Sequence, residues 1–310
     1  MSLDGPQLVD GDLAHVLYNG FMDKYDAGAD QEELELWAEE TLQNWVCDDM
    51  EREIWATVFG KAFWEIGMLS EKFRNAAEET IEEGKGITFW SAHGFGDQRK
   101  KVLVELLQTI SSPNPSPRER KTYAVVNEFT FPINSAFAYR NGDGNYQACI
   151  LTRIEQYRGE CNYGFTPTTY IGGEPPAVGD LKAVLGVKIG YGFSRERAVV
   201  EQPGIEVFWE DPVFVSYLNE AEALLPKEMR STLFVLGLNV TMVEHECLSS
   251  FQEQFIPIGQ VKIRDGFKAA GSTGSASAFE AFEERNRDIE NSKRVFGYLE
   301  IPLDRISERP

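Results

Sequence analysis

Histidine is the side chain best suited to acid–base catalysis near neutral pH, and this chain has only three, His15, His93 and His245. His93 lies in the segment WSAHGFGD, where glycines flank it and Asp97 follows four residues later. This spacing could place a general base and an orienting carboxylate at a pocket, as in a hydrolase or transferase. The segment is equally typical of the end of one helix and the start of the next. An enzyme that uses the His93 loop is therefore the alternative hypothesis.

Cysteine chemistry has little support in the sequence. His245 could activate Cys161 or Cys247 as a nucleophile, but no known catalytic signature surrounds either residue. The other two cysteines, Cys47 and Cys149, are also far apart, and the chain contains no Cys-x-x-Cys pair at the spacing of a zinc site. We therefore expect reduced, structural thiols, no metal site and no cofactor.

A glycine- and serine-rich run, AGSTGSAS at residues 270–277, precedes a predicted helix. A helix N-terminus can bind phosphate, but the run lacks the Gly-Lys-Ser/Thr ending of a phosphate-binding loop. Its composition instead predicts a mobile loop. Ser277 and Glu280 have the spacing of a capping box, which predicts that the next helix begins at Ala278.

The strongest chemical feature is negative charge near the N-terminus. The first sixty residues contain fifteen of the fifty acidic residues of the chain and only two basic residues. Such a cluster can attract a basic protein and speed the encounter by about 10- to 1000-fold at low salt. The alternative is a solvated surface that only keeps the protein soluble. The predicted partner-binding residues are Glu32, Glu35, Glu39, Glu40, Asp48, Asp49 and Glu51.

Overall composition excludes several classes of partner. The formal charge of −20 opposes binding to the phosphate backbone of nucleic acids. No window approaches the roughly 18 uninterrupted apolar residues that a membrane helix needs, and the N-terminus lacks the pattern of a signal peptide. We therefore expect a cytoplasmic protein that binds neither nucleic acid nor membrane. The sequence leaves the oligomeric state open.

Residues 1–117 are predicted to form an acidic, tryptophan-rich helical domain. Apolar residues recur there at intervals of three and four, and residues 54–69 are apolar nearly all round, which is typical of a central, buried helix. Three prolines at alternate positions in residues 113–117 then predict an extended linker. Five of the six tryptophans are expected in the core of this domain: Trp37, Trp45, Trp55, Trp64 and Trp90. A basic island is expected to dock onto the acidic region of the same chain: Arg99, Lys100, Lys101, Arg118, Arg120 and Lys121.

Residues 118–310 are predicted to form a β-rich domain with one or two helices. The clearest element is a hairpin whose turn, NGDG at residues 141–144, contains two glycines that can adopt positive φ. Alternating apolar residues and turn residues at short intervals predict a curved antiparallel sheet or incomplete barrel. Further strands are predicted at residues 168–171, 183–191, 205–209, 232–238, 260–263 and 296–301, and helices at residues 220–225 and 278–287.

The same hairpin carries a family resemblance. Residues 131–140, FPINSAFAYR, and residues 144–154, GNYQACILTRI, resemble the signature of bacterial polymorphic-toxin immunity proteins of the twenty-sixth immunity class. Asn134 and Ser135 stand where that signature usually has Gly-Asp. The resemblance implies a non-enzymatic cytosolic protein that binds and neutralises a secreted toxin, and it transfers no catalytic residue.

These observations together predict an α+β protein with an N-terminal helical bundle and a C-terminal domain built on a strongly bent antiparallel sheet. The leading functional hypothesis is an immunity protein that inhibits a cognate toxin, and the expected partner is a basic protein. Two alternatives stay open: an enzyme that uses the His93 loop, and an acidic mimic of nucleic acid.

Overall fold

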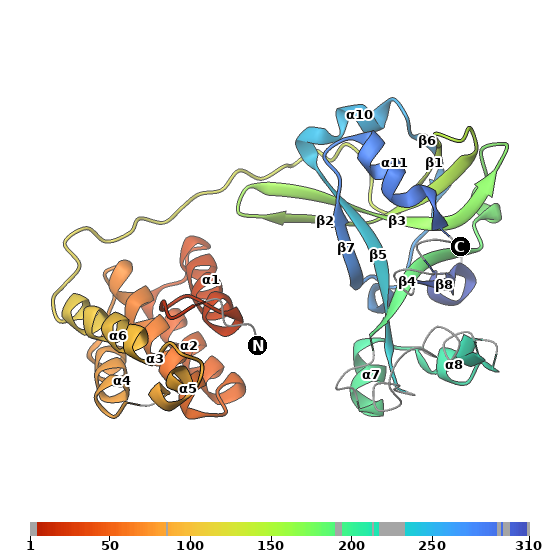
Figure 1. Ribbon diagram of the computed structural model, residues 1–310. Helices are drawn as coiled ribbons and strands as arrows, with labels where there is room; N and C mark the ends of the chain where they lie inside the picture. The colour runs from red at the N-terminus through yellow and green to blue at the C-terminus, as the bar shows by residue number, and fades with distance from the viewer. Residues whose placement is uncertain are drawn as a thin grey trace. The chain divides into compact units, whose positions relative to one another are not determined.

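The computed structural model describes residues 5–84, 86–189, 194–212, 214–216, 233–289, 293 and 298–308 (Figure 1). The chain divides into two compact units, Met1–Thr122 and Tyr123–Pro310, which we call the helical unit and the sheet unit. The predicted α+β class, with helices first and a mostly antiparallel sheet after them, is confirmed. Among the helices of the described segments, none combines the length and apolarity needed to cross a bilayer.

The helical unit is organised around one central helix, α3. This helix contacts α1, α2, α4 and α6 and is buried on most of its circumference, as the apolar pattern of residues 54–69 predicts. Phe63, near the C-terminal end of this helix, packs against Phe21 of α1 and Phe73 of α4 at ring distances of 4.7 and 4.5 Å. The helices are α1 (Asp12–Asp26), α2 (Gln31–Trp45), α3 (Asp49–Glu65), α4 (Glu71–Glu82), α5 (Ile87–Ala92) and α6 (Gly96–Ile110).

The five tryptophans of this unit do not all belong to its core. Trp55 and Trp90 are buried, and Trp37 and Trp64 are half-buried. Trp45, the last residue of α2, is 44% exposed, so the prediction that it packs in the core is wrong. Its position explains the difference, because the chain leaves the helix there and no neighbouring helix covers the ring in the described residues.

The proline-rich segment is attached to the helical unit. The Asn114 side chain donates hydrogen bonds to two carbonyls at the end of α3, one of them that of Glu65 at 3.1 Å. Arg118 forms an ion pair with Asp26 of α1 at 2.7 Å, and Arg120 donates to the carbonyl of Ala29 at 2.7 Å. The prediction that the basic island docks onto acidic parts of the same chain is therefore confirmed for these arginines.

A third arginine of the basic island, Arg99, is completely buried. Its Nε donates to Glu53 Oε1 at 2.7 Å, and neither side chain is exposed to solvent. Its Nη1 donates to the carbonyls of Pro6 and Gln7, and its guanidinium lies 4.5 Å from the ring centre of Trp90. Burial raises the pKa of Glu53 although Arg99 opposes the shift. This pair connects α3, α5, α6 and the segment before α1.

The sheet unit contains one open sheet of eight described strands (Figure 1). Its order is β6-β1-β2-β3-β4-β5-β7, with β8 paired to β4 and a further pairing between β3 and β5. All pairs are antiparallel except β5 and β7. The strands are β1 (Ser135–Arg140), β2 (Tyr146–Tyr157), β3 (Glu160–Gly172), β4 (Ala183–Ile189), β5 (Val235–Glu244), β6 (Ile256–Gln260), β7 (Ala270–Ser275) and β8 (Leu299–Pro302).

Alternate side chains of these strands enter two separate cores. Ala136 and Ile150 belong to an aliphatic core, which also contains residues of β4, β5 and β8. Phe137 and Leu151, one residue further along, belong to an aromatic core. Helix α11 (Phe279–Arg287) supplies rings to this second core, and its bounds confirm the helix predicted at residues 278–287.

The glycine-rich run predicted to be a mobile loop is a strand, β7, parallel to β5. Gly271 and Gly237 lie back to back, because a Cβ built on Gly237 would stand 2.4 Å from the Gly271 Cα. Two residues without side chains thus allow the strands to approach closely, and the backbone bonds of β5 order a segment that has little apolar surface. The predicted capping box is also wrong, since Ala278 is the N-cap of α11 and no side chain caps it.

Several predicted strands change type or length. Residues 206–209, predicted as part of a strand, form the short helix α8 (Glu206–Trp209), and Phe208 on this helix and its N-cap residue Ile205 are both buried in the core. The strand predicted at residues 260–263 lies earlier, as β6. The helix predicted at residues 220–225 lies outside the described residues. The other helices of the described residues are α7 (Arg195–Glu201), α10 (Ser249–Gln252) and α13 (Leu303–Ile306), and single turns of 3₁₀ helix occur at Val178–Asp180, His245–Cys247 and Asp265–Phe267.

Candidate functional site

The seven predicted binding residues lie on α2 and at the start of α3, and we call them the acidic surface. None of their side chains is buried. The structure therefore places the whole set within reach of solvent on two consecutive helices of the helical unit. Its members are Glu32, Glu35, Glu39, Glu40, Asp48, Asp49 and Glu51.

Two of these carboxylates stabilise the start of α3. Asp48 is the N-cap, and its side chain accepts a hydrogen bond from the Glu51 backbone N–H at 2.8 Å. The Glu51 carboxylate accepts from the backbone N–H of Cys47 at 2.7 Å. An N-terminal carboxylate satisfies free N–H groups and interacts favourably with the helix dipole. Asp48 and Glu51 are therefore accounted for by helix capping.

Two further members have partners on neighbouring turns or helices. Glu39 forms an ion pair with Lys72 of α4. The Glu35 carboxylate accepts a hydrogen bond from the Gln31 side chain, one turn earlier, at 2.9 Å. Both contacts are exposed, and exposed pairs of this kind contribute about 0.2–1 kcal/mol. These carboxylates remain open to a partner at little energetic cost.

The other three members, Glu32, Glu40 and Asp49, make no side-chain hydrogen bond or ion pair within the described segments. Leu36 lies four residues after Glu32 and four before Glu40, so Leu36 and these two glutamates share one face of α2. The Leu36 side chain is 58% exposed. Sequence reasoning missed this leucine, although its spacing between two carboxylates would have identified it as an apolar centre in an acidic rim.

The structure gives His93 a local structural role. The residue follows α5, and its Nδ1 lies 2.9 Å from the carbonyl oxygen of Phe89. Its ring centre is 4.3 Å from that of Phe89. No hydrogen bond or ion pair joins His93 to Asp97 in this described range, so the orienting carboxylate that the sequence suggests is not in place.

His245 faces a tyrosine. Its Nδ1 lies 3.2 Å from the Tyr163 hydroxyl, which also accepts a hydrogen bond from the Thr130 backbone N–H. Burial, together with the negative charge of Glu246, raises the pKa of Cys161. A raised pKa keeps the thiol protonated and unreactive, which argues against Cys161 as a nucleophile.

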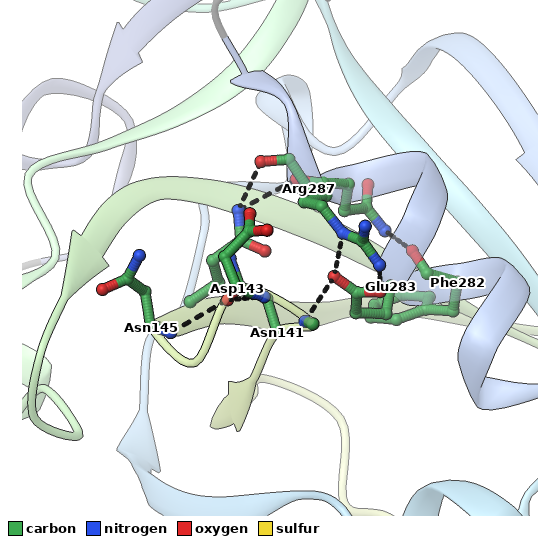
Figure 2. Close-up of polar contacts among 9 residues, drawn as sticks. Asn141, Asp143, Asn145, Phe282, Glu283 and Arg287 are labelled. Atoms are coloured by element: carbon green, nitrogen blue, oxygen red, sulfur yellow. Dashed lines mark hydrogen bonds and ion pairs between the residues drawn. The ribbon is translucent and has the colours of Figure 1, made fainter.

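The hairpin that carries the family resemblance is fixed to α11 through its turn (Figure 2). Asn141 Oδ1 accepts hydrogen bonds from the N–H groups of Asp143 and Asn145 at 3.1 and 2.9 Å. The N–H of Gly142 donates to Glu283 Oε1 of α11 at 3.1 Å. Glu283 in turn pairs with Arg287, which lies one turn further along the helix (Figure 2).

The two turn glycines have different reasons to be glycine. Gly144 has φ of 85°, as the sequence predicts. Gly142 does not adopt positive φ, so that part of the prediction is wrong. A Cβ at Gly142 would instead lie 2.7 Å from the Arg287 Nη2. The turn residues of the hairpin therefore contact α11, and their polar groups stabilise the fold.

Replacing Glu283 by glutamine is expected to lower the free energy of unfolding by about 1–3 kcal/mol at pH 7, because charge-assisted hydrogen bonds are lost. The bond from Arg287, followed by that from Gly142, holds the pKa of Glu283 below its ordinary value. Its contribution is therefore present above the unfolded-state pKa and is lost as pH falls through the lower folded pKa. Urea unfolding at pH 7 and pH 3 tests this expectation, with the exposed neighbour Glu284→Gln as control. Equal deficits at both pH values would contradict it.

The described residues contain no group of three or more His, Cys, Asp or Glu side chains arranged to hold a metal ion. The resemblance of residues 131–155 to an immunity class has no counterpart in the comparisons with known proteins. No protein-family model, curated protein or solved structure matches this chain.

Proposed function

We propose that this chain is a cytosolic binding protein whose helical unit docks a basic protein, and that it acts as an immunity protein against a cognate toxin. The observation that carries the proposal is the exposed Leu36, which lies between Glu32 and Glu40, two carboxylates with no partner among the described residues. Protein interfaces commonly combine an apolar centre with a polar rim. The more specific role, immunity against a toxin, is supported by the family resemblance of the hairpin.

The chemistry of the surface specifies the partner. Carboxylates around an apolar residue favour a partner with lysine or arginine around a small apolar pocket. The long-range field of the acidic surface accelerates encounter, whereas the buried contact at Leu36 slows dissociation. The two contributions can be measured separately, because salt screens the first and leaves the second nearly unchanged.

Charge reversal on α2 is the direct test of this proposal. Binding of basic proteins from the source lysate to the immobilised chain is compared at 0.1 M and 1 M salt, where the Debye length falls from ~10 to ~3 Å. The retained protein is then purified and titrated against Glu32→Lys/Glu40→Lys, for which we expect at least a tenfold loss of affinity. Leu36→Ser should raise the dissociation rate with little change in salt dependence.

The matched control carries the same change in net charge on another helix. Glu79 and Glu82 are exposed on α4, so Glu79→Lys/Glu82→Lys alters the overall field but not the acidic surface. An equal loss of affinity in this control would refute recognition through α2. Competition of the retained protein with nucleic acid would favour the acidic mimic, and loss of an enzymatic activity in His93→Ala would favour the enzyme.

A further inference from the structure

A cleft of about 1030 Å³ opens in the sheet unit beside β8. Leu181, Phe214, Val261 and Leu303 border it, and each of these side chains is less than a tenth exposed. Small-molecule sites in proteins have volumes of about 300–1000 Å³ and mostly apolar walls with a few polar groups. The cleft therefore has the size and lining of a binding site.

Two of the carboxylates that line the cleft already face cations. Asp211 forms an ion pair with Arg305, whose guanidinium also lies 5.7 Å from the ring centre of Phe208. Glu300 of β8 forms an ion pair with Lys293. Within each pair the opposite charges neutralise one another. The two pairs therefore fix the walls of the cleft and contribute little net charge to it.

Among the described residues that line the cleft, the remaining charges are one cation and one anion. Lys182 and Asp304 are both exposed. The Lys182 ammonium donates to a backbone carbonyl, that of Gly179, at 2.7 Å, and Asp304 has no side-chain partner among the residues described. The backbone N–H of Leu303 donates to the Lys182 carbonyl at 2.9 Å, which places Asp304 one residue from this contact. The Lys182 ammonium and the Asp304 carboxylate therefore both border the cleft, on segments that this backbone hydrogen bond joins, and they form no ion pair with each other.

We propose that this cleft binds a short apolar peptide with free termini. The peptide carboxylate pairs with Lys182, its ammonium pairs with Asp304, and its aliphatic side chains lie against Leu181 and Val261. A zwitterionic ligand complements both of these charges, whereas a simple fatty acid or amine complements only one of them. The site belongs to the sheet unit and is independent of the acidic surface.

Calorimetric titration of the full chain with the dipeptide Leu-Leu, its N-acetyl form and its C-terminal amide tests the proposal. The free dipeptide should bind about fivefold tighter than either blocked form, which is the upper range for one exposed ion pair. In Asp304→Asn the preference over the N-acetyl form should disappear and the preference over the amide should remain. Lys182→Met should give the reverse pattern.

Glu308→Gln is the matched control, because Glu308 is paired with Lys262 outside the cleft and should leave all three affinities unchanged. Absence of binding at millimolar dipeptide overturns the proposal, as do equal affinities for the free and blocked forms. Identical responses of the two cleft variants would also overturn it. Unchanged circular dichroism and thermal unfolding confirm that each variant is folded. Failure here leaves the binding function of the helical unit intact, since its test uses α2 variants only.

Discussion

Arg99→Met is expected to lower the free energy of unfolding of the helical unit by about 3–5 kcal/mol, the range found when one partner of a buried ion pair is removed. Methionine fills much of the same space but leaves the Glu53 carboxylate buried without its cation. It also removes the donors to the carbonyls of Pro6 and Gln7. Urea unfolding followed by tryptophan fluorescence measures the loss, because five of the six tryptophans lie in this unit.

The double variant Arg99→Met/Glu53→Leu separates the ion pair from its cost of burial. Replacing both partners by apolar side chains is commonly neutral or stabilising, so the double variant should recover most of the stability that Arg99→Met loses. Because the folded pKa of Glu53 is raised, its contribution is largest below the unfolded-state pKa and is lost as pH rises through the folded value. Glu53→Gln should remove this dependence. If Arg99→Met had the same free energy of unfolding as the wild type, the Arg99–Glu53 ion pair would not be essential for stability.

Phe282→Ala is expected to lower the free energy of unfolding of the sheet unit by about 3–5 kcal/mol through loss of burial and creation of a cavity. The side chain is fully buried on α11. Its ring lies 5.5 to 6.2 Å from those of Tyr139, Phe165, Phe251, Phe255 and Phe279. Near-ultraviolet circular dichroism during urea unfolding reports this aromatic core.

Glu280→Ala provides the control for Phe282→Ala, since Glu280 is exposed on the same helix and its loss should change stability by less than about 0.5 kcal/mol. The variant Phe282→Ala should also reduce hydrogen-exchange protection at Gly142, whose N–H depends on the position of α11. A loss below about 1 kcal/mol would mean that the neighbouring rings close the cavity.

Local sequence signals predicted the helical unit well because apolar residues recur there at intervals of three and four over long segments. The apolar run of α3 and the positive φ of Gly144 are both properties of nearby residues. Strand β7 has no such signal. Its glycines are ordered by β5, which lies about thirty residues earlier in the sequence, and composition alone favours a loop.

The candidate site was also predicted only in part from the sequence. Acidic residues could be selected from the sequence by charge alone, but their hydrogen-bonding partners could not. Lys72 reaches Glu39 from another helix, and Asp48 is occupied by capping. The exposure of Leu36 and the cleft beside β8 both depend on tertiary packing, so neither could be read from a local pattern.

The pairing of β1 with β6 has a consequence for synthesis on the ribosome. Phe137 pairs with Pro257, which is made 120 residues later (257 minus 137). At about 5–20 residues per second, the edge of β1 waits roughly 6–24 s for its partner strand. Helices α1 to α6 have been synthesised before then. The nascent chain therefore carries a complete helical unit and an open sheet edge, and this interval is when chaperones would protect it.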